Sequence, residues 1–290
     1  MSPLLAWLSR RSLRFLHALG AMLGWAAYLL SPSYRQRLVI NAKLAGISPA
    51  QRRASVAEAG KLVMELPRLW LRPATQAIGD PVRWEGAELI EATLDAGKGL
   101  VLLTPHMGSF EICAQAYAQR FGPRRPITVL YRPARQAWLR ELEETARARP
   151  ALATAPASLA GVRQMMRALR RGESLGLLPD QVPPDGMGVW APFFGQPAYT
   201  MTLAARLVLQ NDADVCLIWG ERLPRGEGYV VRVQPLGTPL PAKGQMDDET
   251  WMTAAATVIN ASMELLIRAR PQQYLWGYHR YKQPRRLDAA

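Results

Sequence analysis

The sequence predicts an α/β protein in which helices cover both faces of a largely parallel central sheet, an αβα sandwich. Short continuous apolar runs, typical of strands buried on both faces, alternate with segments of helical periodicity from Lys98 onward. In such sheets ligands bind beyond the carboxyl ends of the strands. His106, Arg132 and Asp180 each follow a predicted strand, so we expect the functional site at that edge.

The N-terminal run FLHALGAMLGWAAYLL (residues 15–30) is apolar and has arginines on both sides. It is slightly shorter than the about 20 residues that span a bilayer. Residues 31–34 form a poor signal-peptide cleavage site, and a buried core helix is an open alternative. The basic flanks favour a membrane anchor over residues 1–35, either short-spanning or lying in the interface, before a second domain at 36–290. Because basic residues stand at both ends, the orientation is not specified.

The remaining chain reads as an ordered series of helices and strands. A helix at about 48–71 begins at Ser48 or Pro49, and Pro67 should end or kink it. The other predicted helices cover residues 108–120, 136–147, 159–171, 201–210 and 250–269, and the predicted strands cover residues 99–104, 127–131, 174–178, 215–219 and 229–233.

The net charge of +13 and the pI near 10.3 imply an anionic partner: nucleic acid, anionic lipid or an acidic carrier protein. The arginines recur in short groups beside apolar sequence rather than in one arm, which favours a membrane surface over nucleic acid. A merely solvated basic surface is the plainer interpretation. The two cysteines, Cys113 and Cys216, lack metal-type spacing and read as buried free thiols.

The segment TPHMGSFE (residues 104–111) carries the candidate chemistry. His106 leaves a buried strand, and Glu111 falls in the first turn of the next helix. A carboxylate on one imidazole nitrogen would leave the other to act as a general base on a hydroxyl. The alternative is a structural histidine beside a helix-capping glutamate. Ser109 lacks the GxSxG context of a nucleophile.

No metal or nucleotide cofactor is expected. The other histidines are His17, in the apolar N-terminal run, and His279, so a His-rich metal site is not predicted. The phosphate-binding patterns GxxxxGK[ST] and strand-borne GxGxxG are absent from the sequence.

Several motifs in order make the chain resemble the lysophospholipid acyltransferase superfamily and, within it, the late lauroyl or myristoyl transferases of bacterial lipid A synthesis. They are His106 with Glu111, then YRP at 131–133, LPDQ at 178–181, PFFG at 192–195, QYLW at 273–276 and HRYK at 279–282. One HxxxxE pair is weak evidence by itself, whereas the ordered set extends over almost the whole chain.

The resemblance implies an acyltransferase domain at the cytoplasmic face of a bacterial inner membrane. It implies an acyl–acyl carrier protein (or acyl-CoA) donor, an anionic glycolipid acceptor hydroxyl, no cofactor and no nucleic acid. His106 would be the general base and Glu111 its orienting partner. Arg132 is a candidate substrate contact, as are Asp180 and an arginine, either Arg147 or Arg149.

Two further features of the site are predicted less directly. Backbone N–H groups near Gly108, or an arginine, could bind the oxyanion that forms when a thioester is attacked. The acyl chain needs an apolar groove, for which Trp190, Phe193 and Phe194 are candidates together with Val189 and the N-terminal helices; ordinary core packing is the alternative.

Two other functions stay open from the sequence. The same chemistry could serve another acceptor, such as a phosphatidylinositol mannoside, an ornithine lipid or a lysophospholipid. A non-enzymatic basic protein that binds anionic lipid or nucleic acid would account for the charge but leaves His106 and Glu111 unexplained.

Overall fold

The computed structural model describes residues 3–131, 136, 140, 143 and 149–285. The helices in these residues are α1 (Pro3–Ser9), α2 (Leu13–Leu30), α3 (Pro32–Leu44), α4 (Pro49–Trp70), α5 (Ala87–Asp95), α6 (Phe110–Arg120), α8 (Leu159–Arg170), α9 (Leu203–Asn211) and α10 (Asp248–Ala269), with short 3₁₀ turns η1 (Pro224–Gly226) and η2 (Pro271–Gln273). The strands are β1 (Val82–Glu85), β2 (Leu100–Leu103), β3 (Ile127–Tyr131), β4 (Leu152–Pro156), β5 (Ser174–Leu177), β6 (Gly188–Phe193), β7 (Gln196–Met201), β8 (Asp214–Arg222) and β9 (Tyr229–Pro235).

A seven-stranded sheet with the order β1-β9-β8-β2-β5-β3-β4 forms the centre of the described structure. Five neighbouring strands run parallel to one another: β4, β3, β5, β2 and β8. Strand β9 runs antiparallel to β8, and β1 pairs in parallel with β9. Strands β6 and β7 form a separate antiparallel hairpin. The predicted largely parallel sheet is confirmed.

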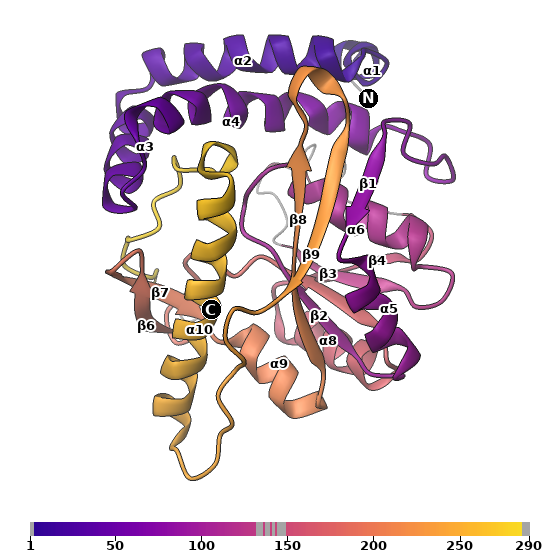
Figure 1. The fold of residues 1–290 in the computed structure, drawn as a ribbon, viewed down its shortest axis with the longest axis vertical. Helices are drawn as coiled ribbons and strands as arrows, with labels where there is room; N and C mark the ends of the chain where they lie inside the picture. The colour runs from indigo at the N-terminus through magenta and orange to yellow at the C-terminus, as the bar shows by residue number, and fades with distance from the viewer. Residues whose placement is uncertain (1–2, 132–135, 137–139, 141–142, 144–148, 286–290) are drawn as a thin grey trace.

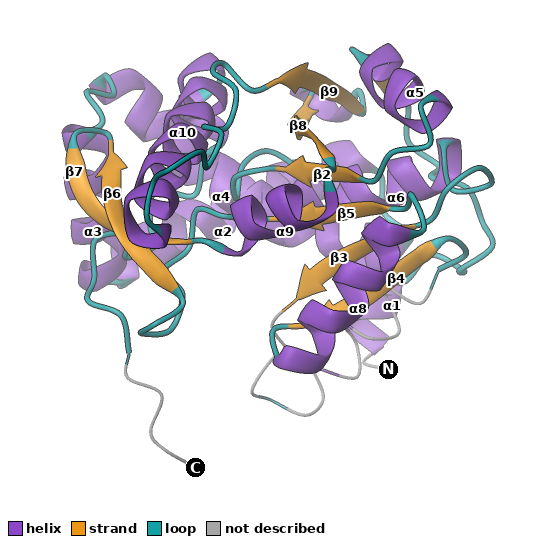
Figure 2. Ribbon diagram, turned by 90° about the horizontal axis from the view of Figure 1, so that it is seen from below, coloured by secondary structure: helices purple, strands orange, loops and turns teal. Residues whose placement is uncertain are grey.

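Helices cover both faces of this sheet, and each face has its own apolar core. Because alternate residues of a strand point to opposite faces, Val101 and Leu103 of β2 pack with residues of α8, α9 and α10, whereas Leu100 and Leu102 pack with residues of α5 and α6. Figure 2 shows α8 and α9 on one side of the strands and α6 beyond them on the other. The αβα sandwich predicted from the sequence is therefore confirmed.

The N-terminal helices lie together along one edge of the molecule. Figure 1 shows α2 and α4 side by side, with α2 outermost and the β8–β9 hairpin reaching up to them. Ser12 caps α2 by accepting a hydrogen bond from Phe15, and Ser48 and Gln51 form a reciprocal capping box at the start of α4. Three glycines let the two helices approach closely: a Cβ on Gly60 would lie 1.9 Å from the carbonyl oxygen of Gly20, and one on Gly24 would lie 2.3 Å from that of Val56.

Helix α2 is long and apolar enough by length and composition to cross a membrane, with a mean hydropathy of 1.3, and 28% of it is buried inside the protein. Its buried residues include Leu13, His17, Gly20 and Gly24, spaced along one stripe. The opposite face carries exposed apolar side chains: Phe15, Met22, Leu23, Trp25, Leu29 and Leu30. Helix α2 is thus docked against α4 on one side and apolar on the other.

The predicted elements that the structure describes lie within a few residues of their predicted bounds, whereas α3, α5, β1, β4 and the β6–β7 hairpin were not predicted. Pro67 lies inside α4, and the helix ends three residues later at Trp70, where the N–H of Leu71 bonds to the carbonyl of Pro67. The helix predicted at 136–147 falls mostly outside the described residues.

Substitution of Gly60 by alanine should lower the free energy of unfolding by about 1–3 kcal/mol, because the new methyl group collides with the backbone of α2 and the helices must separate. This outweighs the about 1 kcal/mol that alanine gains over glycine in a helix. Thermal unfolding in mild detergent measures it. Val63→Ala, at an exposed position of the same helix, is the control, and equal stability of both variants would contradict the close packing.

Candidate active site

His106 and Asp180 meet at the carboxyl edge of the sheet because their strands are neighbours in register. Strands β2 and β5 pair in parallel, with Leu103 opposite Leu177. His106 lies three residues after Leu103, and Asp180 lies three residues after Leu177. Equal offsets from paired residues in parallel strands bring the two side chains to the same place.

Asp180 holds His106 by two hydrogen bonds. Its Oδ1 lies 2.7 Å from Nδ1 of the imidazole, and its Oδ2 accepts the backbone N–H of His106 at 2.9 Å. The carboxylate is buried, whereas a fifth of the imidazole side chain is exposed, at 20%. The acid therefore fixes the ring from the protein side and leaves its other edge toward the open side of the site.

The charge on Asp180 determines the proton position on His106. Burial raises the pKa of the Asp180 carboxyl, but the charge and hydrogen bonds of His106 outweigh it, so the pKa lies below its ordinary 3.8. An ionised carboxylate can only accept, so in the neutral imidazole Nδ1 carries the proton and Nε2 has the free electron pair. This is the tautomer that a general base requires.

Nε2 of His106 faces the amide of Gln181, whose Nε2 lies 3.0 Å away. Since the ring nitrogen can only accept in this tautomer, the amide nitrogen of Gln181 donates to it. The edge of the His106 ring also meets Phe110, with ring centroids 5.1 Å apart.

Glu111 takes a different position from the one predicted. It lies in the first turn of α6, as expected, but its Oε2 accepts the indole N–H of Trp70 at 3.2 Å. The orienting contact on Nδ1 of His106, expected from Glu111, is made by Asp180. Asp180 was predicted as a substrate contact, and only the strand order shows that it stands beside His106.

The backbone N–H groups of the turn after His106 are already bonded. The N–H of Met107 donates to Pro105, that of Gly108 to Gln273, and that of Ser109 to Gly220. Gly108 has φ +56°, and a Cβ there would lie 2.0 Å from the carbonyl oxygen of Gly220. The amides near Gly108, one predicted source of oxyanion donors, are thus bonded within the turn, to η2 and to β8.

The C-terminal QYLW motif also fastens this turn. The N–H of Leu275 donates to the carbonyl of His106 at 3.1 Å, and Met107 forms a bridge with Tyr274. The Gln273 side chain bonds both the N–H and the carbonyl of Arg222 at the end of β8. The QYLW motif, one of the ordered motifs that carry the family resemblance, thus holds the backbone of the histidine turn in place.

A buried ion-pair network joins this turn to the N-terminal helices. Arg222 donates to both carboxylate oxygens of Glu65 in α4 and to the carbonyl of Gly108, at 2.9–3.1 Å. Nε2 of His17 in α2 lies 3.2 Å from the same carboxylate, and Glu58 takes another N–H of Arg222 at 2.7 Å. Burial alone would raise the pKa of Glu65, but the charges and hydrogen bonds of Arg222 and His17 bring this pKa below its ordinary 4.5.

The predicted arginines divide into described and undescribed residues. Arg132 and Arg147 lie outside the described residues. Arg149 is buried, and its guanidinium donates to the carbonyls at the end of α4: those of Leu69, Trp70, Arg72 and Pro73, at 2.8–3.3 Å. A cation there complements the negative end of the helix dipole, so the described contacts of Arg149 are structural.

The predicted groove residues also separate. Phe193 and Phe194 are buried in the core between the β6–β7 hairpin and α10, in edge-to-face contact with each other. Phe193 and Phe194 therefore belong to the ordinary apolar core and do not line an open groove. Trp190 is 41% exposed, and Val189 is partly buried against the same core.

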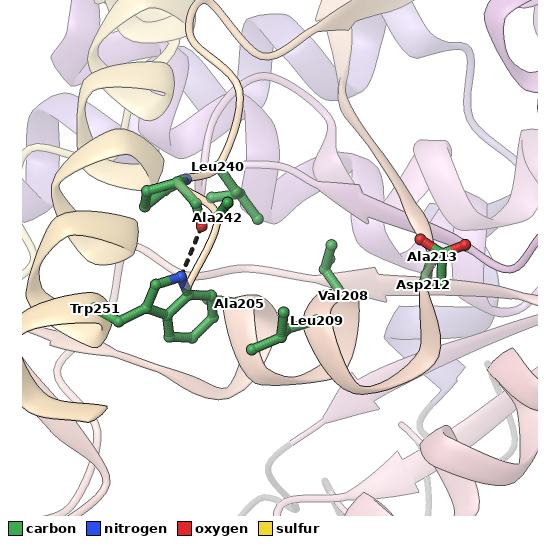
Figure 3. A pocket seen from close by; sticks show the side chains of 9 residues that line it. Ala205, Val208, Leu209, Asp212, Ala213, Leu240, Ala242 and Trp251 are labelled. Carbon is green, nitrogen blue, oxygen red and sulfur yellow. Dashed lines mark hydrogen bonds between the residues drawn. The ribbon is translucent and has the colours of Figure 1, made fainter. Parts of the chain in front are cut away.

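A cavity of about 190 Å³ lies between α9 and the segment before α10 and is lined by none of the predicted site residues. Figure 3 shows its lining, in which the indole N–H of Trp251 donates to the carbonyl of Pro241.

Cys113 and Cys216 are buried free thiols, as predicted. Within the described ranges, no three His, Cys, Asp or Glu side chains gather as metal ligands would.

A histidine oriented by a buried carboxylate, at the carboxyl edge of a sheet in an αβα sandwich, has the geometry to take a proton from a hydroxyl. The chain belongs to the bacterial lipid A biosynthesis acyltransferase family, whose model matches residues 5–283. The resemblance drawn from the ordered motifs is thereby confirmed. The chain is also similar to the lipid A biosynthesis lauroyltransferase of Escherichia coli (strain K12), with 25% identity over 227 residues that cover 77% of this chain and 69% of that protein.

Substitution of Asp180 by asparagine should lower kcat for acyl transfer by about 10²–10⁴-fold. The amide can donate to Nδ1 of His106, which favours the tautomer with a proton on Nε2 and removes the electron pair that the base needs. Release of thiol from a labelled acyl thioester measures the rate. Asp185→Asn, an exposed residue in the same loop, is the control; full activity of Asp180→Asn would show that the pairing is not used in catalysis.

Proposed function

We propose that this protein transfers a fatty acyl chain from a thioester to a hydroxyl of a lipid A precursor, with His106 as the general base. The observation that carries the proposal is how His106 is held: buried Asp180 binds Nδ1, Nε2 is left to the Gln181 amide, and 20% of the side chain is exposed. Membership of the lipid A acyltransferase family supports the reaction class.

In the proposed reaction, Nε2 of His106 removes the proton of the acceptor hydroxyl as its oxygen attacks the thioester carbonyl. The imidazolium is stabilised by Asp180. When the tetrahedral intermediate collapses, the carbon–sulfur bond breaks and the sulfur takes the proton from Nε2, so an ester and a free thiol leave. This chemistry needs neither a metal nor a cofactor.

Glu111 has a supporting place in this proposal. It follows Phe110, whose ring meets that of His106, and Trp70 holds its carboxylate from the end of α4. We therefore keep Glu111 with His106 as a proposed catalytic residue, placed beside the histidine through Phe110 and Trp70.

The donor in this proposal is an acyl–acyl carrier protein, with acyl-CoA as the alternative. Arg163, Arg167 and Arg170 are exposed at helical spacing on α8, and no other described residue forms an ion pair with any of the three. A row of cations of this kind suits an acidic partner protein. The similarity to a lauroyltransferase favours a medium-length saturated chain.

The membrane contact in this proposal is the outer face of α1 and α2, which would lie in the plane of the bilayer surface. The inner face of α2 is held by the close glycine contacts with α4 and by His17 on Glu65. Helix α4 itself carries Arg52, Arg53, Glu58, Lys61, Glu65 and Arg68. Moving this pair of helices, with the charges of α4, into the hydrocarbon core of a bilayer would cost much free energy. An apolar face with basic neighbours instead suits the interface between membrane and water.

A cavity beside this face suits an anionic lipid head group. It has a volume of about 250 Å³ and is lined by Trp25, Tyr28, Arg52, Arg53 and Val56. Aromatic rings and arginines of this kind are favoured at the level of lipid head groups. In this proposal the protein lies at the cytoplasmic face of a bacterial inner membrane, the location that its resemblance to the family implies.

Substitution of Leu30 by aspartate should weaken binding to phosphatidylglycerol vesicles about tenfold or more, since a leucine that is 83% exposed would no longer enter the lipid. Vesicle co-flotation measures the binding, and phosphatidylcholine vesicles should bind the wild-type protein more weakly. Leu159→Asp, at a leucine of α8 that is 75% exposed, should bind as wild type. Equal binding by both variants would contradict the proposed face.

Substitution of His106 by alanine should abolish acyl transfer by the purified protein, and Glu111→Ala should lose most of it, because the base and the carboxylate placed beside it are removed. In a strain that lacks the gene, mass spectrometry should show lipid A without one secondary acyl chain. Wild-type protein should restore the chain, and His106→Ala should not.

Each alternative has its own outcome in this experiment. Unchanged lipid A with a change in another lipid would assign the same chemistry to a different acceptor. Undiminished activity of His106→Ala would overturn the mechanism. Salt-sensitive DNA binding without acyl transfer would favour a non-enzymatic role.

A further inference from the structure

Gln181 occupies the one nitrogen of His106 that the proposed reaction uses. Its amide nitrogen lies 3.0 Å from Nε2 of the imidazole. Nε2 of a neutral imidazole has a single in-plane electron pair. The acceptor hydroxyl must donate to that same pair, so the Gln181 amide has to leave Nε2 when the hydroxyl arrives.

The reaction also needs a donor for the oxyanion, and the backbone N–H groups from His106 to Ser109 are already bonded. The N–H of His106 bonds to Asp180. Those of Met107, Gly108 and Ser109 bond to backbone carbonyls. To serve an oxyanion, any of these four would first have to break a bond that holds the histidine turn. In contrast, the side-chain amide of Gln181 carries two N–H donors. One of them bonds to Nε2 of His106, the nitrogen to which the acceptor hydroxyl must donate.

The chain around Gln181 is held in place while its side chain is partly exposed. Asp180 is buried and doubly bonded to His106. On the other side, the N–H of Val182 donates to the hydroxyl of Tyr278 at 3.0 Å. A rotation of one side chain is therefore enough to turn the Gln181 amide from Nε2 toward a carbonyl bound beside it, without movement of the backbone.

We propose that Gln181 is a further catalytic residue, whose side-chain amide leaves His106 when the acceptor hydroxyl binds and then donates to the carbonyl oxygen of the acyl thioester. This inference rests on the proposed acyl transfer. As the hydroxyl oxygen bonds to the carbonyl carbon, its proton goes to Nε2 and the π electrons go to the carbonyl oxygen, which accepts the N–H of Gln181. The oxyanion then re-forms the carbonyl, and the thiolate leaves with the proton from His106.

The experiment compares the purified full-length wild-type protein with Gln181→Ala, Gln181→Asn, Gln181→Glu and His106→Ala. Radiolabelled lauroyl–acyl carrier protein is the donor, and a lipid A precursor with free β-hydroxyl groups is the acceptor. Loss of one oxyanion donor should lower kcat of Gln181→Ala by about 10²–10³-fold, with a much smaller change in KM. Gln181→Asn keeps an amide on a shorter arm and should recover part of the loss.

Gln181→Glu separates a catalytic from a structural role, since it matches glutamine in size but has no N–H donor when ionised. Its kcat should fall at least as far as that of Gln181→Ala. The acid limb of its kcat/KM profile should move to higher pH, because the added carboxylate favours the imidazolium form of His106. Gln181→Ala should move that limb in the same direction by less, because it loses the N–H that favours the neutral form of His106 but adds no charge.

Three results would overturn the inference. Unchanged or raised kcat in Gln181→Ala, with His106→Ala inactive, would show that the amide only covers the base, and the proposed function would stand. A loss in Gln181→Asn as large as that in Gln181→Ala, with Gln181→Glu active, would assign the loss to packing. Equal inactivity of the wild-type protein and His106→Ala on the lauroyl thioester would overturn the proposed function and this inference together.

Discussion

The buried ion pair between Glu65 and Arg222 connects the separate parts of this structure. Its two side chains are 0% and 1% exposed, so each charge depends on the other, and loss of one partner would leave an uncompensated charge in the interior. Through Glu65 the pair holds α4 and His17 of α2, and through Arg222 it reaches the carbonyl of Gly108. The same two residues therefore contact both the N-terminal helices and the histidine turn.

This connection gives the N-terminal helices a structural part in the enzyme, beside the membrane contact proposed for them. The apolar outer face of α2 and the buried stripe that meets α4 belong to one helix. The β8–β9 hairpin, which carries Arg222, rises from the central sheet to these helices (Figure 1). A lipid surface under α2 would thus lie against the same framework that holds His106, which suits the proposed transfer to a lipid acceptor.

Much of the fold could be predicted from local patterns. The apolar run at β2 and the glycines after helices reflect short-range constraints on burial and backbone conformation, and they placed the elements to within a few residues. His106 was predicted to be the base because it follows a buried strand. The pairing of Asp180 with His106 could not be predicted, because it depends on β2 and β5 being neighbours in register. For the same reason Gln181 was noticed only as part of a motif.

Sequence alone determined the reaction class, since the ordered motifs, the base and the charge surplus all reside in residue identity and order. Tertiary structure decided which groups meet. It put Asp180 on the imidazole in place of Glu111, turned Arg149 to the end of α4, and buried Phe193 and Phe194 in the core. The physical reason is that contacts between distant segments depend on strand order and on which face of each helix is buried, and a one-residue change in register would exchange those faces.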